Sequence, residues 1–172
     1  EQPAAITATV SPRVEDGLPV LRIPELTDEV LRGIGRVHLV GCGTAMHAGM
    51  VGKTAIEALA RVPAQVDIAS EFRYRDPILK PEDLVIIISQ SGETADSLAA
   101  LRLAKEKGIK TLGIVNVIGS SIAREADNVF YTLAGPEIAV ATTKAYSTQL
   151  IAAYCLAIQF GKIRGTIDDA YY

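Results

Sequence analysis

The sequence predicts an α/β fold: a three-layer sandwich in which helices cover both faces of a five-stranded, mainly parallel sheet. From about residue 25 to residue 160, short β-branched segments alternate with longer segments rich in Ala and Leu, as in parallel sheets whose strands are connected by helices. The run Leu84–Ile88 is apolar at every position, which is typical of a strand buried on both faces. Small polar residues follow two of the predicted strands, where parallel sheets bind ligands.

Five strands and five helices are expected between residues 25 and 165. The helix over 25–32 ends at the glycines of positions 33 and 35, Pro63 stops the helix from 45 to 60, and Gly108 follows the helix from 94 to 107. The strands are predicted at 37–40, 66–69, 84–88, 111–117 and 129–132, and the remaining helices at 119–126 and 142–160. A flavodoxin-like strand order of 2-1-3-4-5 would place the first and third strands side by side.

The two ends of the chain are expected to lie outside this domain, which we assign to residues 25–165. Residues 1–24 hold four of the eight prolines and are predicted to form an extended lead-in. Residues 166–172 form a short tail. The chain opens at Glu1 rather than at Met, which we interpret as a piece of a longer protein.

Composition excludes several classes of function. The 172 residues are 49% hydrophobic, enough for one domain that buries about 70% of its unfolded surface. The net charge is −3 and the basic residues are scattered, so no nucleic-acid partner is expected. Cys42 and Cys155 have neither disulfide nor metal spacing, which favours a reduced, cytoplasmic protein. The longest apolar stretch, 150–160, is too short to span a membrane.

The turn after the third strand carries the chemistry expected of an anion site. It contains Ser89, Gln90, Ser91 and Thr94, and no Lys or Arg occurs between positions 80 and 102. Hydroxyls, an amide and main-chain N–H groups would therefore hold a phosphate without a cation, at the positive end of the next helix. Such a site suits a small phosphate ester that must also leave. Ser91 is the expected N-cap of that helix, and a capped helix without any ligand is the alternative.

The turn after the first strand, Cys42-Gly43-Thr44, would flank the same crevice in the predicted strand order. Gly41 and Gly43 begin a dinucleotide fingerprint, but Met46 stands where it would be completed by Gly. No Walker A sequence and no cluster of metal ligands occurs, so no cofactor or metal is expected. His38 and His47 are interpreted as structural, and Cys42 as a buried, inert thiol.

Residues 89–96, Ser-Gln-Ser-Gly-Glu-Thr-Ala-Asp, resemble the signature of the SIS (sugar isomerase) domain family. The supporting stretches are 42–44, 69–74, 119–121, 135–138 and 143–145. The resemblance covers nearly the whole chain. Within the family, the chain is most similar to the first SIS half of the isomerase part of glutamine:fructose-6-phosphate amidotransferases, the glucosamine-6-phosphate synthases.

This resemblance implies a site for a sugar phosphate, fructose 6-phosphate or glucosamine 6-phosphate. The phosphate would be held by the turn after the third strand, and the sugar would be contacted by the turn after the first strand and by the loop before the last helix. By matching position, the implied binding residues are Cys42, Gly43, Thr44, Ser89, Gln90, Ser91, Thr94, Val140 and Thr142. Ala45 and Thr142 stand where relatives often carry Ser.

The family's enzymes combine a glutaminase domain with two SIS halves, and their ring-opening and proton-transfer residues lie in the second half. The resemblance therefore implies a binding half that contains no catalytic residue and is inactive alone. Its implied partners are the second SIS half, the glutaminase domain and a second copy in a homodimer. Two alternatives stay open: a non-catalytic SIS module that senses sugar phosphates or serves a regulatory role, and a nucleotide-binding scaffold.

Overall fold

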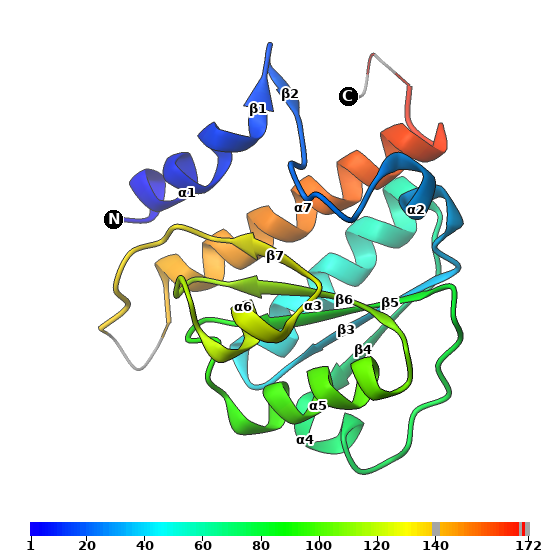
Figure 1. The fold of residues 1–172 in the computed structure, drawn as a ribbon. Helices are drawn as coiled ribbons and strands as arrows, with labels where there is room; N and C mark the ends of the chain where they lie inside the picture. Colours follow the sequence, from blue (N-terminus) through cyan, green and yellow to red (C-terminus); the bar gives the residue numbers. More distant parts are fainter. Residues whose placement is uncertain (139–141, 169, 171–172) are drawn as a thin grey trace.

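The computed structural model describes residues 1–138, 142–168 and 170, and within them a parallel five-stranded sheet forms the centre (Figure 1). The strand order is β4-β3-β5-β6-β7, and each neighbouring pair is parallel. This is the predicted order 2-1-3-4-5. The strands are β3 (Arg36–Gly41), β4 (Ala64–Ile68), β5 (Asp83–Ser89), β6 (Lys110–Val115) and β7 (Asn128–Tyr131).

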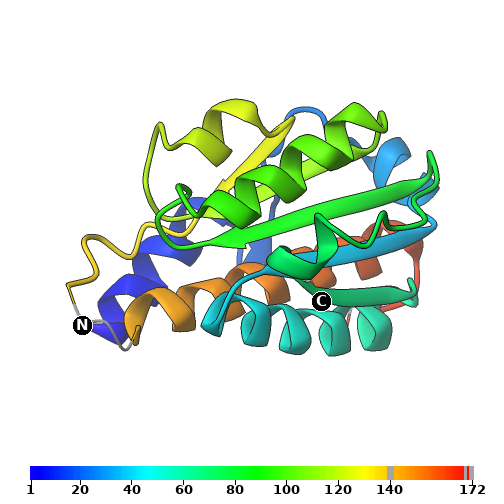
Figure 2. The same ribbon diagram turned by 90° about the horizontal axis from the view of Figure 1, so that it is seen from below.

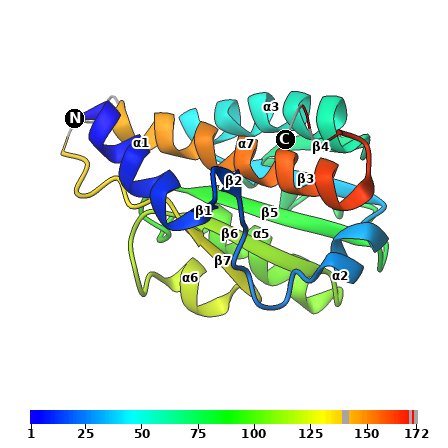
Figure 3. The same ribbon diagram turned by 90° about the horizontal axis from the view of Figure 1, so that it is seen from above.

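Helices cover both faces of the sheet, which confirms the three-layer prediction (Figures 2 and 3). On one face α3 packs against α7, and α1 and α2 also contact α7. On the other face lie α4, α5 and α6. The bounds are α2 (Asp28–Gly33), α3 (Thr44–Ala55), α4 (Ala69–Phe72), α5 (Ala95–Glu106), α6 (Ser121–Glu125) and α7 (Lys144–Arg164). A π-helical turn, η2 (Ile56–Ala60), extends α3.

The central strand β5 supplies both halves of the core, as its unbroken apolar run predicted. Leu84, Ile86 and Ile88 belong to the cluster that includes α7, whereas Val85 and Ile87 belong to the cluster that includes α5. Successive side chains of a strand point to opposite faces. A strand covered by helices on both sides must therefore be apolar at every position.

The N-terminal segment differs from the prediction of an extended lead-in. It begins with helix α1 (Gln2–Val10), followed by a 3₁₀ turn, η1 (Ser11–Arg13), and a small hairpin of β1 (Val14–Glu15) and β2 (Leu18–Pro19). Pro3 and Pro12 stand in the first turns of α1 and η1, where proline is tolerated because those N–H groups have no intrahelical partner. Proline content alone therefore misled the sequence interpretation.

The segment is held against the domain by polar contacts with the end of β7. The hydroxyl of Thr9 is buried and donates to the carbonyl oxygen of Thr132. The Arg13 guanidinium donates to the carbonyl oxygen of Tyr131 at 2.7 Å and lies over the Phe130 ring at 3.9 Å. Residues 1–13 thus contribute to the folded domain.

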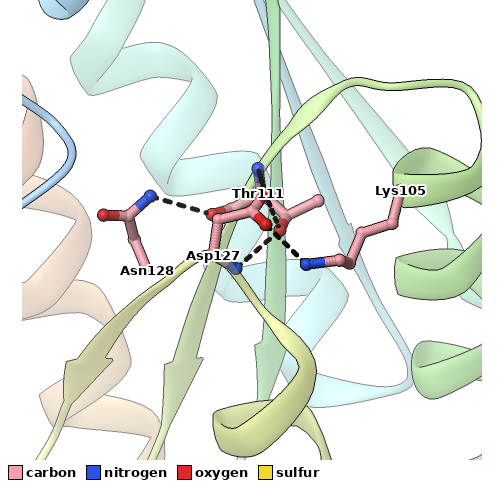
Figure 4. Close-up of polar contacts among 4 residues, drawn as sticks. All are labelled: Lys105, Thr111, Asp127 and Asn128. Carbon is pink, nitrogen blue, oxygen red and sulfur yellow. Dashed lines mark hydrogen bonds and ion pairs between the residues drawn. The ribbon is translucent and has the colours of Figure 1, made fainter.

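At the end of the sheet where the strands begin, the amino-terminal edge, a hydrogen-bond network links neighbouring elements (Figure 4). Asp127 accepts from the N–H of Thr111 at 2.9 Å and from its hydroxyl at 2.7 Å. Lys105, in the last turn of α5, reaches the other carboxylate oxygen at 2.5 Å. The network joins α5, β6 and the approach to β7 at the end of the sheet opposite the predicted site.

None of the helices in the described part of the chain has the length and apolar character needed to cross a lipid bilayer.

Candidate functional site

The two polar turns predicted to flank one crevice do line the same pocket. It has a volume of about 160 Å³ and lies at the carboxyl ends of β3 and β5, where α3 and α5 begin and α7 passes. We call it the strand-end pocket. Its lining residues are Cys42, Thr44, Ala45, Ile88, Ser89, Gln90, Ser91, Thr94, Ser97 and Gln149.

The turn after β5, residues 89–94 (the Ser/Thr loop), is folded by hydrogen bonds between its own side chains and main chain. The Ser89 hydroxyl accepts from the N–H of Gly92 at 3.1 Å and lies 3.3 Å from the Thr94 hydroxyl. The Ser91 hydroxyl accepts from the N–H of Glu93 at 3.2 Å. Of the Ser89 and Thr94 protons, only one is used between the two hydroxyls. The other, with the Ser91 proton, is left to donate to a ligand.

Helix α5 begins at this loop without a side-chain cap. Its N-cap residue is Thr94, and no side chain there accepts from the first turn. The prediction that Ser91 caps the helix is therefore wrong, since its hydroxyl accepts from Glu93 instead. The first-turn N–H groups of a helix lack intrahelical partners, and with the helix dipole they favour an anion.

Helix α3 also begins at the pocket without a side-chain cap, although in its first turn the N–H groups of Ala45 and Met46 donate to the carbonyl oxygens of Cys42 and Gly43. Its N-cap is Gly43, with φ 56° and ψ −129°, and no side-chain cap is formed. Only glycine adopts this conformation readily, because other residues carry a Cβ that clashes with the backbone. Gly43 thus turns the chain so that Thr44, the first residue of α3, lines the pocket.

Hydrogen bonds hold the Ser/Thr loop against the first residues of α6. The carbonyl oxygen of Gly92 accepts from the N–H of Ile122 at 3.0 Å. The Glu93 carboxylate accepts from the N–H of Ser121 at 2.8 Å, and hydrogen bonding from Ser121 lowers the pKa of the Glu93 carboxyl. Gly92, at φ 68°, packs against the buried side chain of Ser120. Residues 120–122 therefore position the loop.

The ten lining residues of the strand-end pocket carry no formal charge. Arg73, which follows α4, reaches the start of α5, but its guanidinium is paired with Asp96 at 2.8 Å. The polarity of the pocket therefore comes from hydroxyls, amides and helix ends. An anion would be held there by short-range hydrogen bonds and by two helix dipoles rather than by a cation.

The structure places most of the predicted site residues at this pocket. Gly43 adjoins it as the N-cap of α3. Cys42 is half-buried rather than fully buried, with its sulfur 4.0 Å from the Ser97 hydroxyl. Thr142 is half-buried and is not a lining residue, and Val140 lies outside the described residues.

The two histidines do not line the strand-end pocket. His38 is buried, and its Nε2 lies 3.1 Å from the Asp83 carboxylate, which confirms its structural interpretation. His47 is exposed on α3.

Sequence reasoning did not assign four lining residues to the site: Ala45, Ile88, Ser97 and Gln149. Ser97 lies three residues after Thr94 on α5, a spacing that places both on one helix face. That signal was available in the sequence. Gln149 lies in α7, far along the chain from both turns, and only the packing of α7 beside α3 brings it to the pocket.

Comparison with known proteins agrees with this geometry. The sequence profile of the SIS domain matches residues 30–159. The chain belongs to the SIS domain family. This SIS domain chain is 55% identical over 169 residues to a glutamine–fructose-6-phosphate aminotransferase (isomerizing) of Clostridium tetani, and 56% identical over 170 residues to that of Caldanaerobacter subterraneus.

A solved structure shows the same architecture. The C-terminal domain of glucosamine-fructose-6-phosphate aminotransferase from Francisella tularensis superposes with a TM-score of 0.94 at 41% identity, over 99% of this SIS chain and 48% of that one. The two bacterial relatives match 98% of this chain, whereas the chain spans 28% of their length. It therefore corresponds to one domain of these longer proteins.

Proposed function

We propose that this chain is the fructose 6-phosphate-binding half of the isomerase part of a glucosamine-6-phosphate synthase. The parent enzyme would convert fructose 6-phosphate and glutamine to glucosamine 6-phosphate and glutamate. The observation that carries the proposal is the strand-end pocket, in which unpaired hydroxyl protons meet two uncapped helix N-termini. The similarity to aminotransferases supports the choice of ligand.

In this proposal the Ser/Thr loop grips the phosphate and Thr44 approaches the sugar. Binding energy from the phosphate, which does not react, would orient the reacting carbons toward catalytic groups elsewhere. The second SIS half supplies those groups, so the chain alone binds but does not turn over its ligand, and it needs no cofactor. The other proposed partners are the glutaminase domain of the parent chain and a second copy in a homodimer, and the proposed location is the cytoplasm.

The test is a calorimetric titration of the chain with fructose 6-phosphate and glucosamine 6-phosphate, with unphosphorylated fructose and NAD as control ligands. Ser91→Ala removes a free hydroxyl donor from the loop. It should weaken fructose 6-phosphate binding by about 1–3 kcal/mol, roughly 5- to 150-fold. Thr54→Ala, at an exposed hydroxyl of α3 outside the pocket, is the matched control and should bind as the wild type does. Unchanged affinity in Ser91→Ala would contradict the assignment.

A second candidate is a non-catalytic SIS module that senses or regulates through sugar phosphates. The described lining residues include no charged group, which is compatible with a module that only binds, because proton transfer at a sugar carbon needs a side chain that titrates. Turnover distinguishes the two functions. The chain mixed with a separately expressed second half and glutaminase domain should form glucosamine 6-phosphate if the synthase assignment is right, and should not if the module only senses its ligand.

A further inference from the structure

Gln149 is a buried amide with an unsatisfied oxygen at the strand-end pocket. It lies in the second turn of α7, is 3% exposed and lines the pocket. Its Oε1 has no hydrogen-bond partner in the described part of the chain. The neighbouring Thr148 is different, because its hydroxyl donates within the helix to the carbonyl oxygen of Ala145 at 2.9 Å.

Buried polar atoms in folded proteins are nearly always hydrogen-bonded, and an exception needs an explanation. Three other buried side-chain atoms of the described residues share this condition, in His38, Ser120 and Asn128. None of those three residues lines the strand-end pocket. Gln149 is therefore the one unsatisfied side chain among them that a ligand in the pocket can reach.

The position of Gln149 differs from that of the Ser/Thr loop. The loop leads into α5, whereas Gln149 belongs to α7, and these helices cover opposite faces of the sheet (Figures 2 and 3). A ligand that contacts both must extend across the end of the sheet. A phosphate seated at the loop would leave the remainder of its ester near the α3 and α7 side, where Ala45 also lines the pocket.

The chemistry of Oε1 determines which ligand groups can form a hydrogen bond with it. A carboxamide oxygen only accepts hydrogen bonds, whereas a sugar hydroxyl can donate one. The dianion of a phosphate ester carries no proton, so the phosphate group of such a ligand cannot satisfy this atom. Inorganic phosphate keeps one proton, but when it is seated at the Ser/Thr loop it lies on the α5 side of the pocket, whereas Gln149 belongs to α7. We infer that Gln149 accepts a hydrogen bond from a hydroxyl of the bound sugar and so selects polyhydroxylated phosphate esters over inorganic phosphate. This inference rests on the proposed sugar-phosphate function and adds a specificity residue to it.

The test compares two ligands, fructose 6-phosphate and inorganic phosphate, by calorimetry on the same chain. Gln149→Met keeps the length of the side chain and removes its hydrogen-bonding groups. It should weaken fructose 6-phosphate binding by about 3- to 30-fold, while inorganic phosphate binds as it does to the wild type. Ser91→Ala gives the reference pattern for a phosphate contact, because it should weaken both ligands by similar factors.

Gln149→Glu keeps an acceptor at the same distance from the main chain. Its added charge should weaken both ligands, yet the ratio of the two affinities should stay closer to the wild-type ratio than in Gln149→Met. The thermal midpoint of Gln149→Met will show whether that variant folds. If it does not fold, Gln149→Glu tests the role of Gln149 in its place.

The outcomes separate the two proposals. If the wild type binds no fructose 6-phosphate, the proposed function is overturned and this inference with it. If the wild type binds fructose 6-phosphate but a folded Gln149→Met binds it equally well, or loses both ligands equally, only the role of Gln149 is overturned. The role would also be overturned if, in Gln149→Glu, the ratio of the affinity for fructose 6-phosphate to that for inorganic phosphate fell toward one.

Discussion

Replacing Gly92 with Ala should damage both the stability of the chain and the Ser/Thr loop, for two separate reasons. Gly92 has φ 68°, in the left-handed region that costs a residue with a Cβ about 1–2 kcal/mol. A Cβ built there would also lie 2.6 Å from the Cβ of Ser120. Rotating the Ser120 side chain cannot relieve that contact, because it involves the carbon attached to the backbone.

The backbone must therefore move, and Ser120 is buried at the start of α6. Overpacking of this kind costs about 1–3 kcal/mol. Added to the backbone term, it predicts that Gly92→Ala lowers the free energy of unfolding by about 2–5 kcal/mol. Gly92 also donates its N–H to the Ser89 hydroxyl. A shift of the backbone at Gly92 therefore also displaces Ser89, one of the residues predicted to bind the phosphate.

Gly108→Ala is the matched control. Gly108 has φ 71°, and nothing lies within 4 Å of a Cβ built on it. It follows α5, at the end of that helix away from the Ser/Thr loop. The control should therefore lose only the backbone term, about 1–2 kcal/mol, and should leave fructose 6-phosphate affinity unchanged.

Urea unfolding of the three proteins measures the stabilities, and calorimetry measures the affinities. Adding Ser120→Gly to Gly92→Ala removes the steric contact and should restore the packing part of the loss but not the backbone part. The reasoning is refuted if Gly92→Ala is no less stable than Gly108→Ala, or if it binds the sugar phosphate as tightly.

Two further predictions concern parts of the fold away from the pocket. Burial opposes ionisation of Asp127, but hydrogen bonds from Lys105 and Thr111 outweigh it and lower the pKa of its carboxyl (Figure 4). Asp127→Asn should therefore destabilise the chain by about 1–3 kcal/mol at pH 7. Urea unfolding at several pH values should show this loss of stability shrinking below about pH 4, because wild-type Asp127 is then protonated as well. A loss of stability that does not depend on pH would contradict the prediction. Asp83→Ala leaves the buried Nε2 of His38 without its acceptor and should cost about 3 kcal/mol by the same measurement, whereas Asp83→Asn keeps an acceptor and should lose less.

The layers and strand order were predictable because they follow from local patterns. The apolar run of β5 admits only a strand covered on both faces. The alternation of strands and helices leaves few topologies, since connections between parallel strands are right-handed. The two polar turns could be joined into one site for the same reason: adjacent parallel strands bring their carboxyl ends to one edge.

The features that were missed depend on contacts between distant segments. Helix α1 has no amphipathic pattern that the sequence reveals, and it is held by Thr9 and Arg13 against the end of β7. The predicted capping of α5 was wrong because the helix begins at Ala95 with Thr94 as its N-cap, so Ser91 lies upstream of the helix and accepts from Glu93 within the loop. The role of Gln149 could not be predicted from the sequence, because it is inferred from an unsatisfied hydrogen bond in the folded structure and not from neighbouring residues in the chain.

The polar side chains at the two ends of the sheet differ in their hydrogen bonding, and this difference supports the proposed position of the site, although the buried Oδ1 of Asn128 at the amino-terminal end also lacks a partner among the described residues. At the amino-terminal edge, Thr111 and Asp127 exchange hydrogen bonds in both directions, and Lys105 neutralises the carboxylate. At the carboxyl-terminal edge, two helices begin without side-chain caps, and hydroxyl protons and the Gln149 oxygen are left unpaired. Because an unpaired buried group reduces stability, the unpaired Gln149 oxygen does not by itself benefit the fold. A ligand that offers phosphate oxygens at one end and hydroxyls at the other would satisfy both sets at once.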